Sequence, residues 1–164
     1  MIEYTWALAG APDIDDIVKM AQTHFQSEID TIFNPEPVTL SRNLTHAVVN
    51  QYYRPGTELV AIARDSAGKL LAYTWAFAND RACWSDDNMV SVRMVHLDLT
   101  LSPRLRIKII KEMMEHWERF ANYAGNDIIC STTMRHDQDA FLKLHERNGY
   151  SVRGSYAYKK LRED

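Results

Sequence analysis

Hydrophobic and polar residues follow two different periods along this chain, and the changes between them mark its elements. Alternation at every second residue is typical of strands with one buried face, and apolar residues three and four apart are typical of amphipathic helices. The first pattern, or a short apolar run, predicts strands at residues 3–9, 58–64, 69–78, 89–101, 126–134 and 150–161. The second pattern predicts helices at residues 13–25, 39–54, 103–124 and 137–148. The resulting order, β-α-α-β-β-β-α-β-α-β, favours an α/β fold with a mixed sheet and helices on both of its faces.

Turn-forming residues separate these elements where the pattern changes. Asp13 follows Gly10-Ala11-Pro12 and is expected to cap the first helix. Asn34-Pro35-Glu36-Pro37 cannot form a regular helix and predicts a loop, after which Thr39 or Ser41 is expected to cap the second helix. Asp65-Ser66-Ala67-Gly68 predicts the turn of a β-hairpin.

The stretch 89–125 joins a predicted strand directly to the longest predicted helix, through Ser102-Pro103-Arg104. A helix N-terminus presents unpaired backbone N–H groups and the positive end of the helix dipole, a combination that binds phosphates. The turn contains no glycine, but Arg104, Arg106 and Lys108 bring positive charge to it. The alternative interpretation is that these residues form the solvated first turns of an ordinary helix.

Composition narrows the class of protein. At 164 residues, with 46% hydrophobic and 25% charged residues, the chain is expected to form a single globular domain over residues 1–164. A net charge of −3 argues against a general nucleic-acid binder, and no apolar run reaches the roughly 18 residues of a membrane span. The N-terminus lacks the basic and apolar parts of a signal peptide, so a cytoplasmic location is expected.

Cysteine and histidine spacing points to no redox or metal centre. Cys83 and Cys130 lie far apart in the sequence and are expected to be buried free thiols. A catalytic cysteine has no local pattern in its favour. The six histidines form neither HxxxH nor HExxH, so no metal site is expected.

His96 and Asp98 carry the first candidate chemistry. They lie two residues apart on a predicted strand, so they should share one face, with Leu97 and Leu99 on the other. Either side chain can accept a proton from a substrate. The alternative interpretation is an ordinary polar strand face beside a cleft.

The order of elements, with two helices after the first strand, resembles that of the GNAT superfamily of acyl-CoA-dependent N-acyltransferases. Three stretches add to the resemblance. Asp98-Leu99-Thr100-Leu101-Ser102-Pro103 is similar to the family's acidic-Leu-x-Val-x-Pro. Arg106 stands where the family's Q/R-x-x-G-x-G/A loop begins. Leu144-His145-Glu146-Arg147-Asn148-Gly149-Tyr150 is similar to the family's Leu/Phe-Tyr-Glu-Lys-x-Gly-Phe.

The resemblance implies a cofactor and a set of site residues. Acetyl-CoA or another acyl-CoA would bind between the fourth and fifth strands. Asp98 or His96 would take a proton from the amine acceptor, and His145 would protonate the departing thiolate. The residues at the family's cofactor-binding positions are Arg104, Arg106, Lys108 and Gln138, the last of which stands where the family often has asparagine.

The chain departs from the family at the cofactor loop and at the thiolate acid. The family's loop glycines let backbone amides approach the pyrophosphate of coenzyme A, whereas Ile107, Ile109 and Lys111 stand there in this chain. His145 replaces a tyrosine; it can also donate a proton, or it can be a half-buried histidine without a catalytic role. Phe141 fills a position that is usually small.

Three hypotheses about function follow from these matches and departures. The combined loss of the loop glycines and the tyrosine slightly favours a GNAT-fold protein that has lost acetyl-CoA catalysis and serves in binding or assembly. Such proteins resemble virion or head proteins of short-tailed phages, here through Phe141-Leu142-Lys143 and Gly149, and would be located in the virion. The alternative is an active N-acyltransferase. A third possibility, an acyl carrier protein as donor, would explain the missing loop. Enzymatic activity is therefore left undecided by the sequence.

The expected partners differ between these hypotheses. A binding or assembly component implies a protein partner or a homo-oligomer, and an active enzyme implies a small-molecule amine or a protein acceptor. Neither a membrane nor a nucleic acid is expected. Trp84, in the polar stretch 79–88, would indicate a partner contact if its side chain is exposed.

Overall fold

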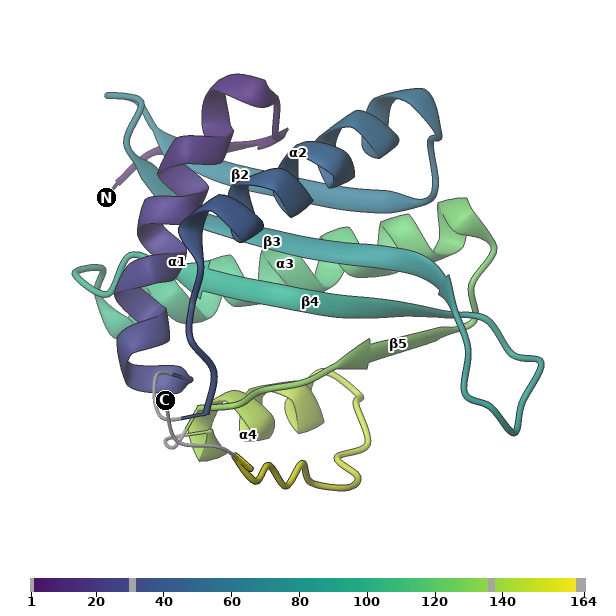
Figure 1. Cartoon of the computed structure of the whole chain (residues 1–164). Coiled ribbons are helices and arrows are strands. Elements are labelled where there is room, and N and C mark those ends of the chain that lie inside the picture. Colours follow the sequence, from purple (N-terminus) through teal and green to yellow (C-terminus); the bar gives the residue numbers. More distant parts are fainter. Residues whose placement is uncertain (1, 30–31, 136–137, 162–164) are drawn as a thin grey trace.

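The computed structural model describes residues 2–29, 32–135 and 138–161, which form a five-stranded sheet with helices on both faces (Figure 1). In chain order the elements are β1 (Tyr4–Leu8), the 3-10 turn η1 (Ala11–Asp13), α1 (Ile14–Glu28), α2 (Pro37–Tyr53), β2 (Glu58–Asp65), β3 (Leu70–Asp80), β4 (Met89–Leu97), α3 (Pro103–Ala124), β5 (Ile128–Ser131) and α4 (Asp139–Arg147). The predicted order is confirmed as far as the last helix. Within the described ranges, no helix is long and apolar enough to cross a membrane.

The strands lie in the sheet in chain order, from β1 at one edge to β5 at the other. Neighbours from β1 to β4 are antiparallel, and β2 and β3 form the predicted hairpin. β4 and β5 are parallel, and α3 supplies the crossover that a parallel pair needs. The mixed sheet predicted from the sequence is therefore confirmed.

Each face of the sheet has its own hydrophobic core. On β2, the side chain of Val60 packs in the core under α1 and α2, whereas those of Leu59 and Ala61 pack in the core under α3, as alternation along a strand requires. The α3 side also buries Trp117, whose indole N–H donates to Thr74 Oγ1 at 2.8 Å. Figure 1 shows α1 and α2 in front of the sheet, α3 behind it and α4 beside β5.

Two element boundaries differ from the predicted ones by a few residues, and each difference has a physical reason. Proline lacks an N–H and has a helical φ, so Pro37 is the first residue of α2, ahead of the predicted caps. The strand predicted to run to residue 101 ends at Leu97. There the carboxylate of Asp98 accepts hydrogen bonds from the backbone N–H and the hydroxyl of Thr100, which closes a turn.

The strand predicted at residues 150–161 is wrong. Residues 151–161 contain no strand, and most of their side chains are exposed. Gly154 has φ +74°, which interrupts the extended backbone that the alternating pattern suggested. The predicted start of the last helix at residue 137 lies outside the described residues.

The two cysteines and Trp84 can now be compared with the burial that the sequence suggested for them. Cys83 is exposed and Cys130, on β5, is half-buried. The expectation of buried thiols is therefore wrong for Cys83 and holds only in part for Cys130; both are free. Trp84 is 86% exposed. The condition set for a partner contact is therefore met, and the contact itself stays a prediction.

Candidate functional site

The site begins where β4 and β5 part. The two strands are paired only from Met89 opposite Ile128 to Val92 opposite Ser131. β4 continues to Leu97 without β5 beside it, and Figure 1 shows the two strands diverging. Backbone N–H and C=O groups on that edge of β4 have no strand partner in the described chain, so they can hydrogen-bond an extended ligand.

A β-bulge on β4 marks the point of divergence. Trp75 of β3 lies opposite Met94, and the next residue, Ala76, lies opposite Val92, so Arg93 is an extra residue on β4. A bulge of this kind bends its strand and increases the local twist. The guanidinium of Arg93 lies 4.0 Å from the ring centroid of Phe77, which holds this side chain on the sheet surface.

A cavity of about 290 Å³ lies between the second half of β4 and the segment that follows β5. Its walls come from the end of α1 and the segment after it, the second half of β4, the segment after β5, and one residue each of α3 and α4. The lining side chains used below are Phe25, Glu28, Phe33, His96, Arg135 and Phe141. The wall is therefore apolar apart from a few charged or titratable groups, as in small-molecule sites generally.

His96 is held in the wall of this cavity by two hydrogen bonds. Its Nε2 lies 3.1 Å from Glu28 Oε2, and its Nδ1 lies 2.6 Å from the hydroxyl of Tyr73 on β3. A carboxylate only accepts, so Nε2 carries the proton and donates. Burial lowers the pKa of His96, which keeps the ring neutral, and Nδ1 therefore accepts from the Tyr73 hydroxyl.

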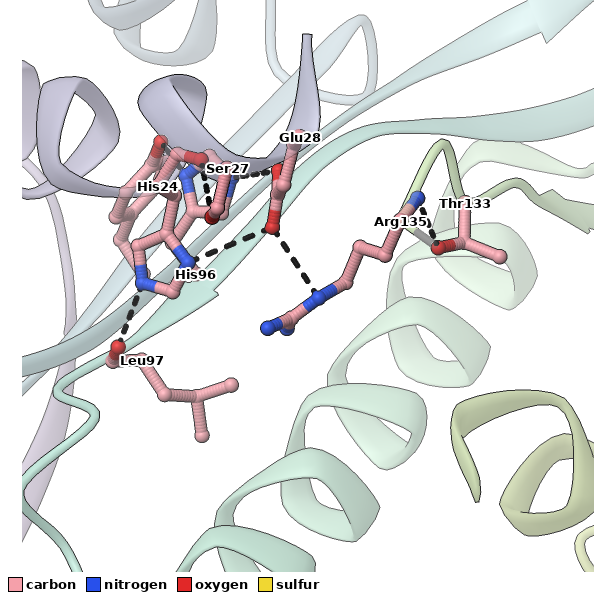
Figure 2. Close-up of polar contacts among 8 residues, drawn as sticks. His24, Ser27, Glu28, His96, Leu97, Thr133 and Arg135 are labelled. Atoms are coloured by element: carbon pink, nitrogen blue, oxygen red, sulfur yellow. Dashed lines mark hydrogen bonds and ion pairs between the residues drawn. The ribbon is translucent and has the colours of Figure 1, made fainter. Parts of the chain in front are cut away.

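His24 of α1 stacks on His96. The ring centroids are 4.3 Å apart and the planes are inclined by 11°. His24 Nε2 donates to the backbone carbonyl of Leu97 at 2.8 Å, and its Nδ1 lies 3.4 Å from Glu28 Oε1 (Figure 2). The cluster thus joins the last turns of α1 to the end of β4.

Glu28 is the charged centre of this cluster. Burial alone would raise its pKa, but the two imidazoles and the positive charge of Arg135, whose Nε lies 3.3 Å from Oε1, lower it from 4.5 to about 2. Burial also raises the pKa of Tyr73 well above its usual range, and the nearby Glu28 charge adds to this shift. At neutral pH the site therefore holds an ionised carboxylate, a neutral phenol and a neutral His96.

The three side chains His24, Glu28 and His96 place one donor atom each within 4.8 Å of the others, which raises the question of a metal ion. Stacked imidazoles direct their lone pairs side by side, so they do not converge on one tetrahedral or octahedral centre. Arg135 also brings a cation to the same carboxylate. The arrangement fits imidazole–carboxylate hydrogen bonding better than metal coordination.

Asp98 and His145, the other two predicted catalytic residues, lie outside the cavity lining. Asp98 pairs with Lys69 and closes the turn with Thr100; burial would raise its pKa, and these partners lower it instead. His145 is 3% exposed. Its Nδ1 donates to the Phe141 carbonyl at 2.9 Å, and its Nε2 accepts from the Ser131 hydroxyl at 3.0 Å. Burial lowers the pKa of His145, so both of its nitrogens are satisfied in the neutral ring.

The predicted phosphate-binding residues are spread along the first turns of α3. Arg104 is exposed, and Arg106 is half-buried with its Nε buried and without a hydrogen-bond partner. Lys108 points to β1, because its Nζ lies 3.7 Å from Glu112 Oε1 and 5.0 Å from the ring centroid of Tyr4.

The residues at the family's glycine positions belong to the helix itself. Ile109 is fully buried in the core and Ile107 is 47% exposed. The hydroxyl of Ser102 caps the first turn by accepting from Leu105 N–H at 3.4 Å, and Pro103 offers no N–H. The start of α3 therefore has fewer free N–H groups for an anion than an uncapped helix. Gln138, the last predicted cofactor contact, precedes α4, and its carbonyl accepts from Leu142 N–H.

Sequence reasoning found His96 but missed its partners. The spacing of His24 and Glu28, four residues apart, puts both on one face of a helix and was a usable signal. It was missed because the predicted helix ended at residue 25, before Glu28, whereas α1 extends to Glu28. Tyr73 and Arg135 could not be found from local patterns, because only the fold brings them to His96 and Glu28.

No protein-family model and no curated protein sequence matches this chain. Solved structures do match it over nearly its whole length. A predicted acetyltransferase from Clostridium acetobutylicum, solved with acetyl-CoA, is 13% identical with a TM-score of 0.74, and the match covers 97% of each chain. The aminoglycoside N-acetyltransferase AAC(6')-Iy, solved with CoA, is 11% identical with a TM-score of 0.70, covering 99% of this chain and 97% of that one. This chain has the GNAT acyltransferase fold.

A third solved structure is similar over the same length. Glucosamine-6-phosphate N-acetyltransferase from Arabidopsis thaliana is 10% identical with a TM-score of 0.69, and the match covers 98% of this chain and 99% of that one. At such identities the likeness establishes the fold alone. All three are described as acetyltransferases, one of them as a predicted one, and the resemblance to phage virion proteins gains no support from them.

Proposed function

We propose that this protein is an N-acyltransferase that moves an acyl group from an acyl-CoA to an amine. The observation that carries the proposal is the cavity between the diverging β4 and β5 with Glu28 and His96 in its wall. Two similar structures contain acetyl-CoA or CoA, which supports the same class of donor here. The sequence alone slightly favoured a non-catalytic protein; the fold neighbours favour the enzyme.

The donor would lie along the open edge of β4. The unpaired backbone groups beyond Val92 can hydrogen-bond the amide-containing arm of an acyl-CoA in the manner of an added strand. The phosphates would lie near the start of α3, where Arg104 and Arg106 supply positive charge. Because this helix start has no glycine and an occupied cap, we expect weaker binding than a glycine-rich loop would give.

The acceptor amine would enter from the α1 side, next to Glu28 and His96. Its nitrogen lone pair would attack the thioester carbonyl carbon, a C–N bond would form and the C–S bond would break. The thiolate would leave with the electron pair and take up the proton that the nitrogen loses, so the products are an amide and a thiol. The backbone N–H groups at the bulge of β4 are suited to hydrogen-bond the oxygen that becomes negatively charged in between. No covalent enzyme intermediate is required by this sequence of steps.

Thermal unfolding with and without acetyl-CoA tests the donor half of the proposal. At 100 times the dissociation constant, the ligand should stabilise the protein by roughly 2.7 kcal/mol, which raises Tm by a few degrees. CoA without an acyl group is the matched ligand control, and release of CoA thiol in the presence of a primary amine tests turnover. If millimolar acetyl-CoA causes no shift in Tm and no turnover, the proposal is refuted. A non-catalytic binding protein would then be the better explanation.

A further inference from the structure

The α1 side of the cavity is lined mainly by large apolar side chains. Its members from the end of α1, the segment after it and β4 are Phe25, Ile29, Phe33 and Met94. Phe25 and Met94 also pack against the core under α1 and α2, which holds both in place. The ring of Phe25 meets the ring of His96 edge to face, with centroids 5.7 Å apart. This end of the cavity is therefore a preformed apolar surface with two aromatic rings.

The C-terminal segment adds a further aromatic ring at the rim of this surface. The rings of Tyr158 and Phe33 meet edge to face, with centroids 5.4 Å apart and planes inclined by 74°. The Tyr158 hydroxyl lies 4.0 Å from the sulfur of Met134, which lines the cavity as Phe33 does. Phe33 is 45% exposed and Tyr158 is 47% exposed, so each ring keeps part of its surface in water. A flat apolar group that enters the cavity beside these rings would cover this surface, which is favourable.

The charged groups of the lining favour an acceptor with a single amino group. Within the described residues, the wall contains one carboxylate, that of Glu28, and two guanidinium groups, those of Arg93 and Arg135. Arg135 is already paired with Glu28, and the guanidinium of Arg93 lies on the ring of Phe77. A polycation would therefore meet more positive than negative charge on this wall, and each additional ammonium group would be repelled.

The size of the cavity limits the acceptor to a small molecule. Its volume is about 290 Å³, and the acyl group at the end of the donor needs a share of this space. Small-molecule pockets usually span about 300–1,000 Å³, so this one lies near the lower limit. One aromatic ring on a short chain fits the remainder, whereas most of a multi-ring amino sugar would stay outside.

We propose that the acceptor is a primary amine joined by a short chain to one aromatic ring, which lies between Phe25 and Phe33 and is covered at the rim by Tyr158. This inference rests on the proposed acyltransferase function and names its substrate class. A C–N bond forms, the thioester C–S bond breaks, and the proton that the nitrogen loses goes to the thiolate. Phe33 and Tyr158 determine specificity through contact with the ring and take no part in these bond changes.

Variants of the two rim residues separate ring contact from a general effect on the protein. Phe33→Ala and Tyr158→Ala each remove one ring, and both side chains are about half exposed, so neither change opens the core. Phe33→Tyr and Tyr158→Phe keep the ring and should keep the selectivity. Tyr53→Ala is the matched control, because this tyrosine is 84% exposed and does not line the cavity. Thermal unfolding checks that each variant is folded.

The first measurement compares 2-phenylethylamine with ethylamine, using acetyl-CoA and released CoA thiol as the readout. In the wild type, kcat/KM per neutral amine should be at least about tenfold higher for 2-phenylethylamine, because its ring leaves water on binding. Phe33→Ala and Tyr158→Ala should each lower this ratio by about threefold to tenfold, chiefly through KM for the aromatic amine. The basicity of the amines cancels when the ratio is compared between variants. Equal values for the two amines, or ratios in these variants that match Tyr53→Ala, would overturn the inference and leave the acyltransferase function standing.

Spermidine tests the charge argument in the same assay. As a polycation, it should have a lower kcat/KM than 2-phenylethylamine. A higher value for spermidine would overturn the inference, although it would support the acyltransferase function.

The second measurement needs no turnover. Saturation-transfer NMR, with and without CoA, should show magnetisation passing from the protein to the ring protons of 2-phenylethylamine in the wild type and in Tyr53→Ala. The transfer should fall in Phe33→Ala and Tyr158→Ala and remain in the two variants that keep the ring. If no amine is acetylated, the proposed function fails, and this result alone decides whether the cavity binds an aromatic amine. Transfer that is absent in the wild type, or equal in all variants, would overturn the inference.

Discussion

The imidazole rings of His24 and His96 stack face to face, with their centroids 4.3 Å apart, although one comes from α1 and the other from β4. Stacking aligns one edge of each ring, and both edges face the carboxylate of Glu28, at 3.4 Å and 3.1 Å. The carboxylate thus bridges a helix and a strand through two imidazoles. The polar wall of the cavity is therefore part of the helix–sheet packing, which fixes its geometry better than a surface loop would.

Tyr73→Phe should destabilise the protein by about 1–3 kcal/mol, because it leaves Nδ1 of His96 buried without a donor. The free energy of unfolding in urea measures the change. Tyr123→Phe is the matched control: its side chain is 71% exposed, so a change within about 0.5 kcal/mol is expected. Equal losses in the two variants would show that the Tyr73 hydroxyl contributes nothing specific to the cluster.

Stability should fall in two steps as the pH is lowered. The pKa of His96 is lowered by burial, so the unfolded chain binds a proton first, and stability falls as pH drops below about 6.5. The pKa of Glu28 is lowered from 4.5 to about 2, so its contribution is present above pH 4.5 and is lost as pH falls from 4.5 towards 2.

Two variants separate these steps in urea titrations at a series of pH values. His96→Gln should flatten the loss that begins near pH 6.5, and Glu28→Gln should flatten the loss below pH 4.5. Other acidic residues add their own slope at low pH, so the comparison is between each variant and Glu115→Gln, an exposed control. Curves for Glu28→Gln and Glu115→Gln that run parallel below pH 4.5 would contradict the assigned shift.

The fold was predictable because local patterns and the layer architecture agree. The hairpin turn at residues 65–68 and the apolar stripe of α3 each carry a clear signal, and the β-α-β crossover follows from their order. The last segment failed because alternation alone cannot say whether a strand has a partner. Residues 151–161 keep the alternating pattern, but Gly154 turns the backbone and most side chains lie in solvent.

The candidate site was only half predictable, because its members depend on tertiary contacts. His96 was singled out from its place on a predicted strand, and the structure puts it in the wall of the cavity. Asp98 also matched a family position, yet the strand ends just before it and its carboxylate is used by Lys69 and Thr100. Glu28 was missed because helix ends are hard to place from sequence, and the proline-rich stretch after it suggested an earlier loop.

Gly125→Ala should destabilise α3 by about 1–2 kcal/mol through the backbone alone. Gly125 ends the helix with φ +69°, a left-handed conformation that costs residues with a Cβ about this much. Apart from its two chain neighbours, no residue in the described part of the chain has an atom within 4 Å of an added Cβ, so steric overlap does not contribute. Gly125→Asn should cost less, because asparagine adopts this conformation more readily. Thermal or urea unfolding checks the order, and an asparagine variant less stable than the alanine variant would contradict the backbone explanation.

Arg106→Ala and Lys108→Ala should affect acetyl-CoA binding differently, although both remove a positive charge from the start of α3. Arg106 is half-buried with an unpartnered Nε, and Lys108 is directed to Glu112 and Tyr4 near β1. A charged hydrogen bond contributes about 1.5–3 kcal/mol, so Arg106→Ala should weaken binding by roughly tenfold or more, and Lys108→Ala by about twofold at most. Isothermal titration calorimetry at two salt concentrations measures both, and the Arg106 effect should shrink at high salt. Equal weakening in the two variants would mean that only the net charge near α3 matters and that Arg106 makes no specific contact with the phosphates.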